Sequence, residues 1–202
     1  MQRVSDRLRE EAGGEGAPGM AAVIGLSPEE AEAAIEKWRE GGLRDLYAAN
    51  FNSPAQLAIS GTEAALREAE ARFPGAGARA VMRLRVAGPF HSPLIADAAE
   101  AFAPALDTVE FADPKIPLYS NVTGARIESG AEAKRLAPLQ ITSPVRWLQV
   151  EAALAAAGGF GACLEVGPGK VLRGFWKDAG SGIPCHGAGS VEEIEKIGTE
   201  GA

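Results

Sequence analysis

One histidine is the residue of this sequence whose surroundings best support chemistry. His91 lies in Val86-Ala-Gly-Pro-Phe-His-Ser-Pro-Leu, where a predicted strand ends and a predicted helix begins. Ligands of open α/β sheets bind at the carboxyl ends of strands, which is the place expected for this side chain. The positive end of the following helix disfavours an imidazolium ion, so we expect a neutral ring that can accept a proton. Because a histidine by itself is more often structural than catalytic, both interpretations stay open.

A second candidate is the turn Gly167-Pro-Gly-Lys-Val, which follows a predicted strand and precedes a predicted helix. It does not match a phosphate-binding P-loop, because Leu164 occupies the place of the upstream glycine and Val171 that of the Mg²⁺-binding Ser or Thr. A structural turn is favoured, with a helix N-terminus that faces an anion as the alternative. His186 has no comparable setting, and no His, Cys and Asp residues cluster at the spacing of a metal site.

The composition excludes several classes of protein. The 202 residues are 46% hydrophobic, enough for one core or a domain with a small insertion. The net charge of −7, without a basic run, argues against a nucleic-acid or anionic-membrane partner. The 2 cysteines argue against a disulfide framework or a thiolate zinc site. With neither a signal-peptide pattern nor an apolar run long enough to span a membrane, we expect a soluble, cytoplasmic protein.

The elements that must position these residues fall into two patterns. After an N-terminal helix and loop over residues 1–18, residues 19–88 alternate strands and helices in the order β-α-β-β-α-β, which predicts a ferredoxin-like subdomain. Ser27-Pro-Glu-Glu is a capping box that begins one helix, Thr62 caps another, and Asn50-Phe-Asn-Ser-Pro is typical of a turn. The predicted strands of this subdomain cover residues 20–26, 45–49, 56–60 and 79–86.

Residues 89–202 follow a different pattern, in which apolar strands alternate with helices. This pattern predicts a parallel sheet covered by helices. The predicted strands cover residues 116–122, 162–166 and 183–188. One predicted helix begins at Ser92-Pro93 and runs to residue 106, and another begins at Ser143-Pro144 and runs to residue 157. Two shorter helices are predicted over residues 172–176 and 191–197.

Six segments in a fixed order resemble one family, the malonyl-CoA:acyl-carrier-protein transacylases of bacterial fatty-acid synthesis, which are related to the acyltransferase domains of polyketide synthases. The segments are Gly19-Met-Ala-Ala-Val-Ile-Gly-Leu, Asn50-Phe-Asn-Ser-Pro-Ala-Gln, Gly88-Pro-Phe-His-Ser-Pro-Leu, Tyr119-Ser-Asn-Val, Ser143-Pro-Val-Arg-Trp and Glu165-Val-Gly-Pro-Gly-Lys-Val-Leu. The resemblance implies an α/β-hydrolase-like parallel sheet with an inserted ferredoxin-like subdomain.

The resemblance also implies an activity. In this family a serine in a Gly-His-Ser-x-Gly elbow attacks the malonyl thioester of malonyl-CoA, and a histidine takes its proton. The malonyl group then passes to the phosphopantetheine thiol of acyl carrier protein, without a further cofactor or a metal. His91 matches the base, and Gln140 matches a position whose backbone carbonyl holds that histidine. Phe90 matches the bulky residue associated with malonyl selection, and Asn50 and Asn52 match a loop that borders the cleft.

The sequence departs from the family in one respect that affects the mechanism. It contains no Gly-His-Ser-x-Gly, and Met1-Gln2 corresponds to a pair that normally follows the family's carboxylate-binding arginine. Ser92, next to His91, cannot easily align with it and is not expected to be the nucleophile. We therefore expect the C-terminal two-thirds of a malonyl transacylase, inactive alone, with an N-terminal half-enzyme as a candidate partner. The alternatives are part of a polyketide-type acyltransferase and a non-catalytic module that binds carrier protein.

Overall fold

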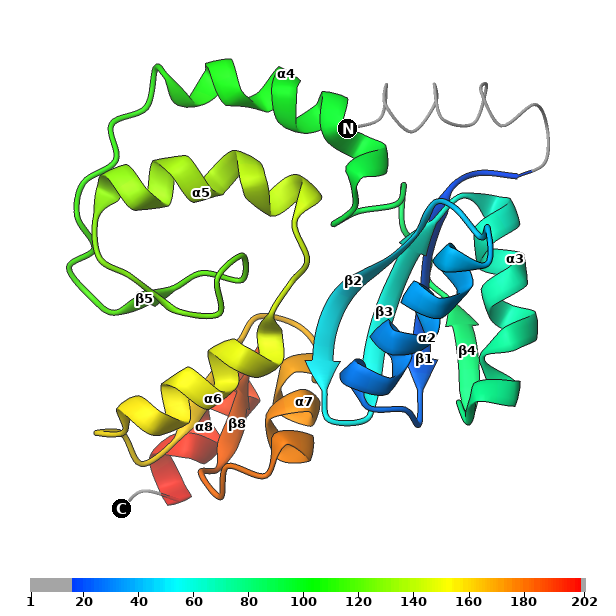
Figure 1. Cartoon of the computed structure of the whole chain (residues 1–202). Helices are drawn as coiled ribbons and strands as arrows, with labels where there is room; N and C mark the ends of the chain where they lie inside the picture. Colours follow the sequence, from blue (N-terminus) through cyan, green and yellow to red (C-terminus); the bar gives the residue numbers. More distant parts are fainter. Residues whose placement is uncertain (1–15, 201–202) are drawn as a thin grey trace.

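The computed structural model describes residues 16–200, with side chains through residue 197. Most of the helix and loop predicted for residues 1–18 lies outside the described residues. The described residues form a four-stranded sheet with two helices, a pair of long helices, and a C-terminal group of helices and strands. Figure 1 shows the pair of long helices lying side by side. The mixed α/β class predicted from the sequence is confirmed.

The four-stranded sheet is antiparallel and has the strand order β2-β3-β1-β4. Two helices, α2 and α3, are interleaved with its strands in the chain. Its elements are β1 (Gly19–Ile24), α2 (Pro28–Glu40), β2 (Leu46–Ser53), β3 (Gln56–Gly61), α3 (Glu63–Arg72), the 3₁₀ turn η1 (Pro74–Ala76) and β4 (Ala80–Arg83).

Local sequence signals explain both helices of this unit. The Ser27 hydroxyl accepts a hydrogen bond from the Glu30 main-chain N–H while the Glu30 carboxylate accepts one from Ser27, so the predicted capping box is confirmed. Thr62 accepts from Ala65 in the same way. The two helices cover one face of the sheet, where Phe73 is fully buried and meets Trp38 edge-on at a centroid distance of 4.7 Å.

The segment predicted as a turn at 50–54 is instead largely strand. β2 continues through Ser53, so Asn50 and Asn52 are strand residues and the reversal is confined to Pro54 and Ala55. β4 is shorter than predicted and ends at Arg83, which pairs with Ala21; the next residue, Leu84, still donates to the Met20 carbonyl of β1 before the chain leaves the sheet. On the sheet face opposite the helices, Ala58, the register partner of Asn50, contacts Phe90 of the loop that follows β4.

The middle of the chain departs most from the prediction. It contains η2 (Pro93–Ile95), α4 (Ala96–Leu106), β5 (Leu118–Tyr119), β6 (Arg126–Ile127) and α5 (Gly130–Thr142). The strand predicted over 116–122 is wrong: β5 has two residues and pairs antiparallel with β6. Pro117 lacks a donor for a sheet, and the Ser120 carbonyl accepts from Gly124, which reverses the chain. Helix α5, absent from the prediction, packs against α4 (Figure 1).

The C-terminal part contains the parallel strands that the sequence predicts. Its elements are α6 (Trp147–Ala157), β7 (Cys163–Val166), α7 (Val171–Ala179), β8 (Cys185–Ala188) and α8 (Val191–Glu200), and β7 pairs parallel with β8. The helix predicted from Ser143 begins only at Trp147, because Val145 is extended and bridges Asn50 of β2. No helix in the described part of the chain is long and apolar enough to cross a membrane.

Candidate active site

His91 is held by the C-terminal end of α5. Its main-chain N–H donates to the Ile141 carbonyl at 3.0 Å, and its ring Nδ1 lies 3.0 Å from the Gln140 carbonyl oxygen. Both carbonyls lie in the last turn of α5, where carbonyl oxygens have no N–H four residues further along the helix to bond with. Pro144, four residues after Gln140, has no N–H, and Val145 donates to Ala49 of β2 instead. The sequence after the helix therefore leaves two acceptors for His91.

The contact with Gln140 fixes the tautomer of the ring. A carbonyl oxygen can only accept, so Nδ1 must carry the hydrogen, and in the neutral ring Nε2 is then the proton acceptor. The His91 backbone has φ of 59°, a left-handed conformation uncommon outside glycine. The hydrogen bonds from the His91 main chain to Ile141 and from its ring to Gln140 maintain this conformation. Strained residues at functional sites persist where the surrounding structure holds them in this way.

Burial keeps the His91 ring neutral. Desolvation of the half-buried imidazole lowers the pKa of His91 below its ordinary value, although the carbonyls of Gln140 and Ser143 act in the opposite direction. The sequence predicts a neutral ring for another reason, the positive end of the following helix. The chain after His91 instead begins with the short 3₁₀ turn η2, and burial is the main cause.

Phe90 joins His91 to the open face of the four-stranded sheet. It packs against Met20, Ala49 and Ala58, and its ring centroid lies 6.4 Å from that of His91. The Phe90 carbonyl accepts a hydrogen bond from the buried Ser60 hydroxyl on β3.

Ser92, on the other side of His91, is committed to a structural contact. Its hydroxyl is fully buried and donates to the Pro89 carbonyl at 2.7 Å. A hydroxyl held in this way is not presented as a nucleophile. This agrees with the expectation from the sequence.

The two predicted cleft asparagines lie on β2. Asn50 pairs with Ala58, which contacts Phe90, and bridges Val145 of the segment that follows α5. Its Oδ1 is buried without a hydrogen-bond partner among the described residues. The structure thus brings Asn50, Phe90, His91 and Gln140 to one junction of β2, α5 and the loop after β4. Asn52 lies two residues further along the same strand.

Sequence reasoning missed two parts of this junction. Ser60 has no distinguishing sequence signal, because its role depends on a partner thirty positions away. Helix α5 could have been found from Ser129 and Glu132, since the Ser129 hydroxyl accepts from the Glu132 N–H as an N-cap. Pro138 inside the helix obscures that signal.

The Gly167-Pro-Gly-Lys turn is structural. Gly167 and Gly169 have φ of 114° and 122°, backbone conformations that residues other than glycine rarely adopt. The N-terminus of α7 already holds an anion, because the Glu165 carboxylate accepts from the main-chain N–H groups of Leu172 and Arg173. An external phosphate would have to displace that carboxylate.

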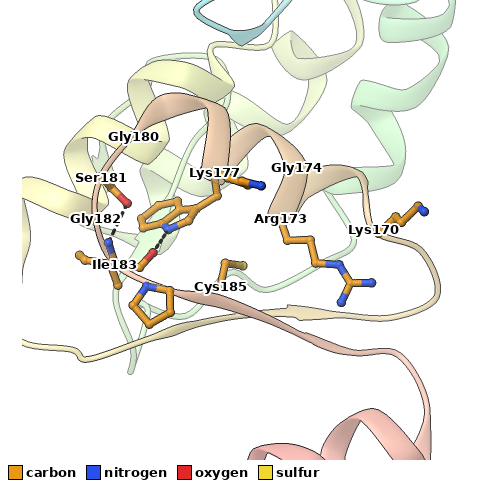
Figure 2. Close-up of a pocket in the computed structure, with 11 residues that line it drawn as sticks. Lys170, Arg173, Gly174, Lys177, Gly180, Ser181, Gly182, Ile183 and Cys185 are labelled. Atoms are coloured by element: carbon orange, nitrogen blue, oxygen red, sulfur yellow. Dashed lines mark hydrogen bonds between the residues drawn. The ribbon is translucent and has the colours of Figure 1, made fainter.

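Two pockets lie around α7. One of about 680 Å³ is lined by Lys170, Arg173 and Lys177 together with the loop after the helix, and Figure 2 shows these side chains along it. The other, of about 360 Å³, is apolar and is lined by Trp147, Trp176 and both cysteines. Across the described residues, no group of three or more His, Cys, Asp and Glu side chains could hold a metal ion.

A half-buried histidine whose Nδ1 contacts a carbonyl has the tautomer that a general base of nucleophilic acyl transfer requires. Comparison with known sequences agrees with that chemistry. Residues 6–196 match the acyl transferase domain, and the chain belongs to that family.

Known proteins similar to this chain include malonyl transacylases. The Haemophilus influenzae malonyl CoA-acyl carrier protein transacylase is 37% identical over 171 residues, 85% of this chain and 54% of that protein. The MCAT crystal structure from Streptococcus pneumoniae has a TM-score of 0.83 at 30% identity, covering 98% of this chain and 63% of that one. A complex of a type II PKS acyl-carrier protein with its malonyl-transacylase has a TM-score of 0.82 at 29% identity, covering 98% and 64%. This chain thus spans about half the length of the curated relatives that it matches.

Proposed function

We propose that this chain supplies the base of a malonyl-CoA:acyl-carrier-protein transacylase. The observation that carries the proposal is the 3.0 Å contact between His91 Nδ1 and the Gln140 carbonyl, which makes Nε2 the proton acceptor. The burial that keeps the ring neutral supports the same role. The printed names of the relatives, which specify malonyl-CoA and acyl carrier protein, supply the substrates.

The reaction then runs in two half-reactions with His91 as proton carrier. A serine hydroxyl attacks the malonyl thioester while Nε2 takes its proton, and the CoA thiolate leaves and receives that proton from the imidazolium. The phosphopantetheine thiol of the carrier protein next attacks the malonyl-serine ester, again losing its proton to Nε2. The serine oxygen leaves and takes the proton back, so the histidine ends as it began.

The serine comes from outside these 202 residues in this proposal, because no Gly-His-Ser-x-Gly occurs among them. It is carried by a polypeptide equivalent to the N-terminal part of the relatives, either ahead of this chain or as a separate half-enzyme. The family's carboxylate-binding arginine would come from the same part. We therefore propose that the 202-residue chain is inactive alone, and that the complete enzyme acts in the cytoplasm.

Phe90, Asn50 and Asn52 form the substrate side of the proposed site. Phe90 is immobilised against three apolar side chains of the sheet, so an aromatic wall there would crowd an α-methyl group on the acyl chain. The buried, unpartnered Oδ1 of Asn50 is suited to accept a hydrogen bond from a bound ligand. In this proposal residues 19–88 form a subdomain that contributes one wall of the cleft, and residues 89–202 contribute the base.

Reconstitution tests the proposal. The N-terminal part of the Haemophilus influenzae relative, fused ahead of residue 1, should restore malonyl transfer to carrier protein, and His91→Ala should abolish it. His186→Ala is the matched control and should leave transfer largely intact. Transfer that persists in the His91→Ala fusion would refute the assignment of the base.

A non-catalytic module that binds carrier protein is the second candidate. The absence of the elbow sequence from these residues favours it, because a binding function needs no nucleophile. Calorimetric titration of the chain with phosphopantetheinylated carrier protein separates the two. Binding together with failure of every reconstitution would support this candidate, and restored transfer would support the enzyme. A carrier protein of polyketide type should be included in the same titration, since one similar structure is such a complex.

A further inference from the structure

The two cysteines of the chain occupy directly paired positions on neighbouring parallel strands. Cys163 of β7 and Cys185 of β8 are register partners, and both are free thiols. Neighbouring strands lie about 4.8 Å apart, and register partners in a parallel pair project to the same face of the sheet. A disulfide needs a Cα separation of about 4.4–6.8 Å, so this backbone geometry falls within the permitted range.

The surroundings of the two thiols agree with this placement. Both side chains are half-buried and line the same apolar pocket of about 360 Å³. Cys185 also reaches the larger pocket beneath α7, where Figure 2 shows it on the same side of the helix as Arg173. Cys185 therefore borders both pockets, and Cys163 borders the smaller one beside it.

We propose that Cys163 and Cys185 form a reversible intramolecular disulfide when the protein meets a hydroperoxide. Cys185 reacts first: its thiolate attacks the outer peroxide oxygen, the O–O bond breaks, and the departing alkoxide takes a proton to become the alcohol. Cys185 is now a sulfenic acid, oxidised by two electrons. The Cys163 sulfur attacks it, the S–O bond breaks, and hydroxide leaves with the Cys163 proton as water. Two thiols and one hydroperoxide thus give one disulfide, one alcohol and one water.

The order of the two cysteines follows from their access to solutes. Cys185 lines both pockets, whereas Cys163 lines only the smaller one, so Cys185 is the attacking thiol and Cys163 the resolving one. Burial raises the pKa of both thiols, and for Cys185 the Glu165 charge raises it further while the Glu165 backbone and the Arg173 guanidinium lower it. Because thiols with a raised pKa react slowly, the oxidation should speed up as the pH rises.

The disulfide would close a ring that contains α7 and the turn before it. Strands held by this bond could not separate without breaking it, so the oxidised C-terminal part should resist local opening. Both sulfurs line a pocket and are only half-buried, and accessible disulfides are the readily reduced ones. This is the behaviour of a transient oxidative modification and not of a structural disulfide. It does not depend on the proposed transferase activity.

Thiol counting on the reduced 202-residue chain tests this proposal. After treatment with hydrogen peroxide, the intact mass should fall by two hydrogen atoms, both alkylatable thiols should be lost, and dithiothreitol should restore them. Digestion should yield the peptide with Cys163 joined to the peptide with Cys185. In Cys163→Ser, dimedone should trap a sulfenic acid at Cys185, and Cys185→Ser should react much more slowly. Disulfide-linked dimers, separate sulfinic acids, or oxidation only after unfolding in urea would each overturn the proposal.

Discussion

The imidazole Nδ1 of His91 lies 3.0 Å from the carbonyl oxygen of Gln140, an acceptor without a helical partner because Pro144 has no N–H to offer. A proline two positions beyond the end of α5 thereby determines the tautomer of a histidine about fifty residues earlier. The same interaction leaves Nε2, on the other side of the ring, as the nitrogen that can accept a proton. The catalytic proposal depends on this relationship.

Burial should make His91 titrate below the ordinary histidine value of 6.5. The unfolded chain then binds a proton that the folded chain does not, so stability from this residue is present above pH 6.5 and is lost as the pH falls through the folded pKa. NMR titration of the ring protons measures this pKa directly, with His91→Gln to assign the resonance. A pKa at or above the ordinary value would contradict the account of burial.

Gln140→Ala should leave His91 unaffected, because the contact is made by the main chain. The side-chain Nε2 of Gln140 is buried without a partner among the described residues, so its removal should be neutral or slightly stabilising. Urea unfolding checks the expected stability, and the NMR titration checks that the His91 pKa is unchanged. A shifted His91 pKa in Gln140→Ala would mean that the side chain, and not only the carbonyl, positions the ring.

Glu151 should make stability fall as the pH rises. It is 2% exposed, and desolvation raises its pKa to about 7, despite the hydrogen bond at 2.6 Å from Trp147 Nε1. The folded state holds the Glu151 proton more tightly than the unfolded state does. The stability that this protonation contributes is therefore fully present below pH 4.5 and is lost as the pH rises towards 7. Urea unfolding across this pH range should show the unfolding free energy falling as the pH rises, and Glu151→Gln should remove most of that pH dependence.

Two further variants make the Glu151 test specific. Glu151→Ala removes the acceptor of Trp147 and should cost about 1–3 kcal/mol. The exposed Glu40→Gln is the matched control and should leave the pH slope unchanged. A slope that survives in Glu151→Gln would assign the effect to another group.

Phe73 should be a main support of the four-stranded sheet and its helices. Its side chain is fully buried against Trp38, so Phe73→Ala should cost about 3–5 kcal/mol of unfolding free energy. Phe102→Ala, at a site that is 40% exposed on α4, should cost about 1 kcal/mol. Denaturant unfolding compares the two, and equal costs would contradict the assignment of the core.

Elements with local signals were the predictable part of the fold. The capping box at Ser27 and the Thr62 cap begin helices where the sequence predicts them, since each depends on residues within one turn. The parallel pairing of β7 with β8 also follows from alternating apolar strands and helices. His91 could be singled out because it lies between a strand and a helix signal.

Features that depend on distant partners could not be predicted in this way. Val145 is extended only because Ala49 and Phe51 of β2 complete its hydrogen bonds, so Ser143-Pro144, a good local helix start, does not begin the helix. Residues 116–122 have the composition of a strand, but no neighbouring strand extends the pairing beyond Tyr119. The Ser60 contact with Phe90 likewise exists only in the folded chain.

The most direct test of the central claim is the intact mass of the purified chain after incubation with malonyl-CoA. The chain alone should show no malonyl adduct. Fused to the N-terminal part of a relative, it should acquire one adduct on the elbow serine, and His91→Ala should prevent it. A malonyl adduct that survives denaturation on the 202-residue chain itself would contradict the account, because the nucleophile would then lie within these residues.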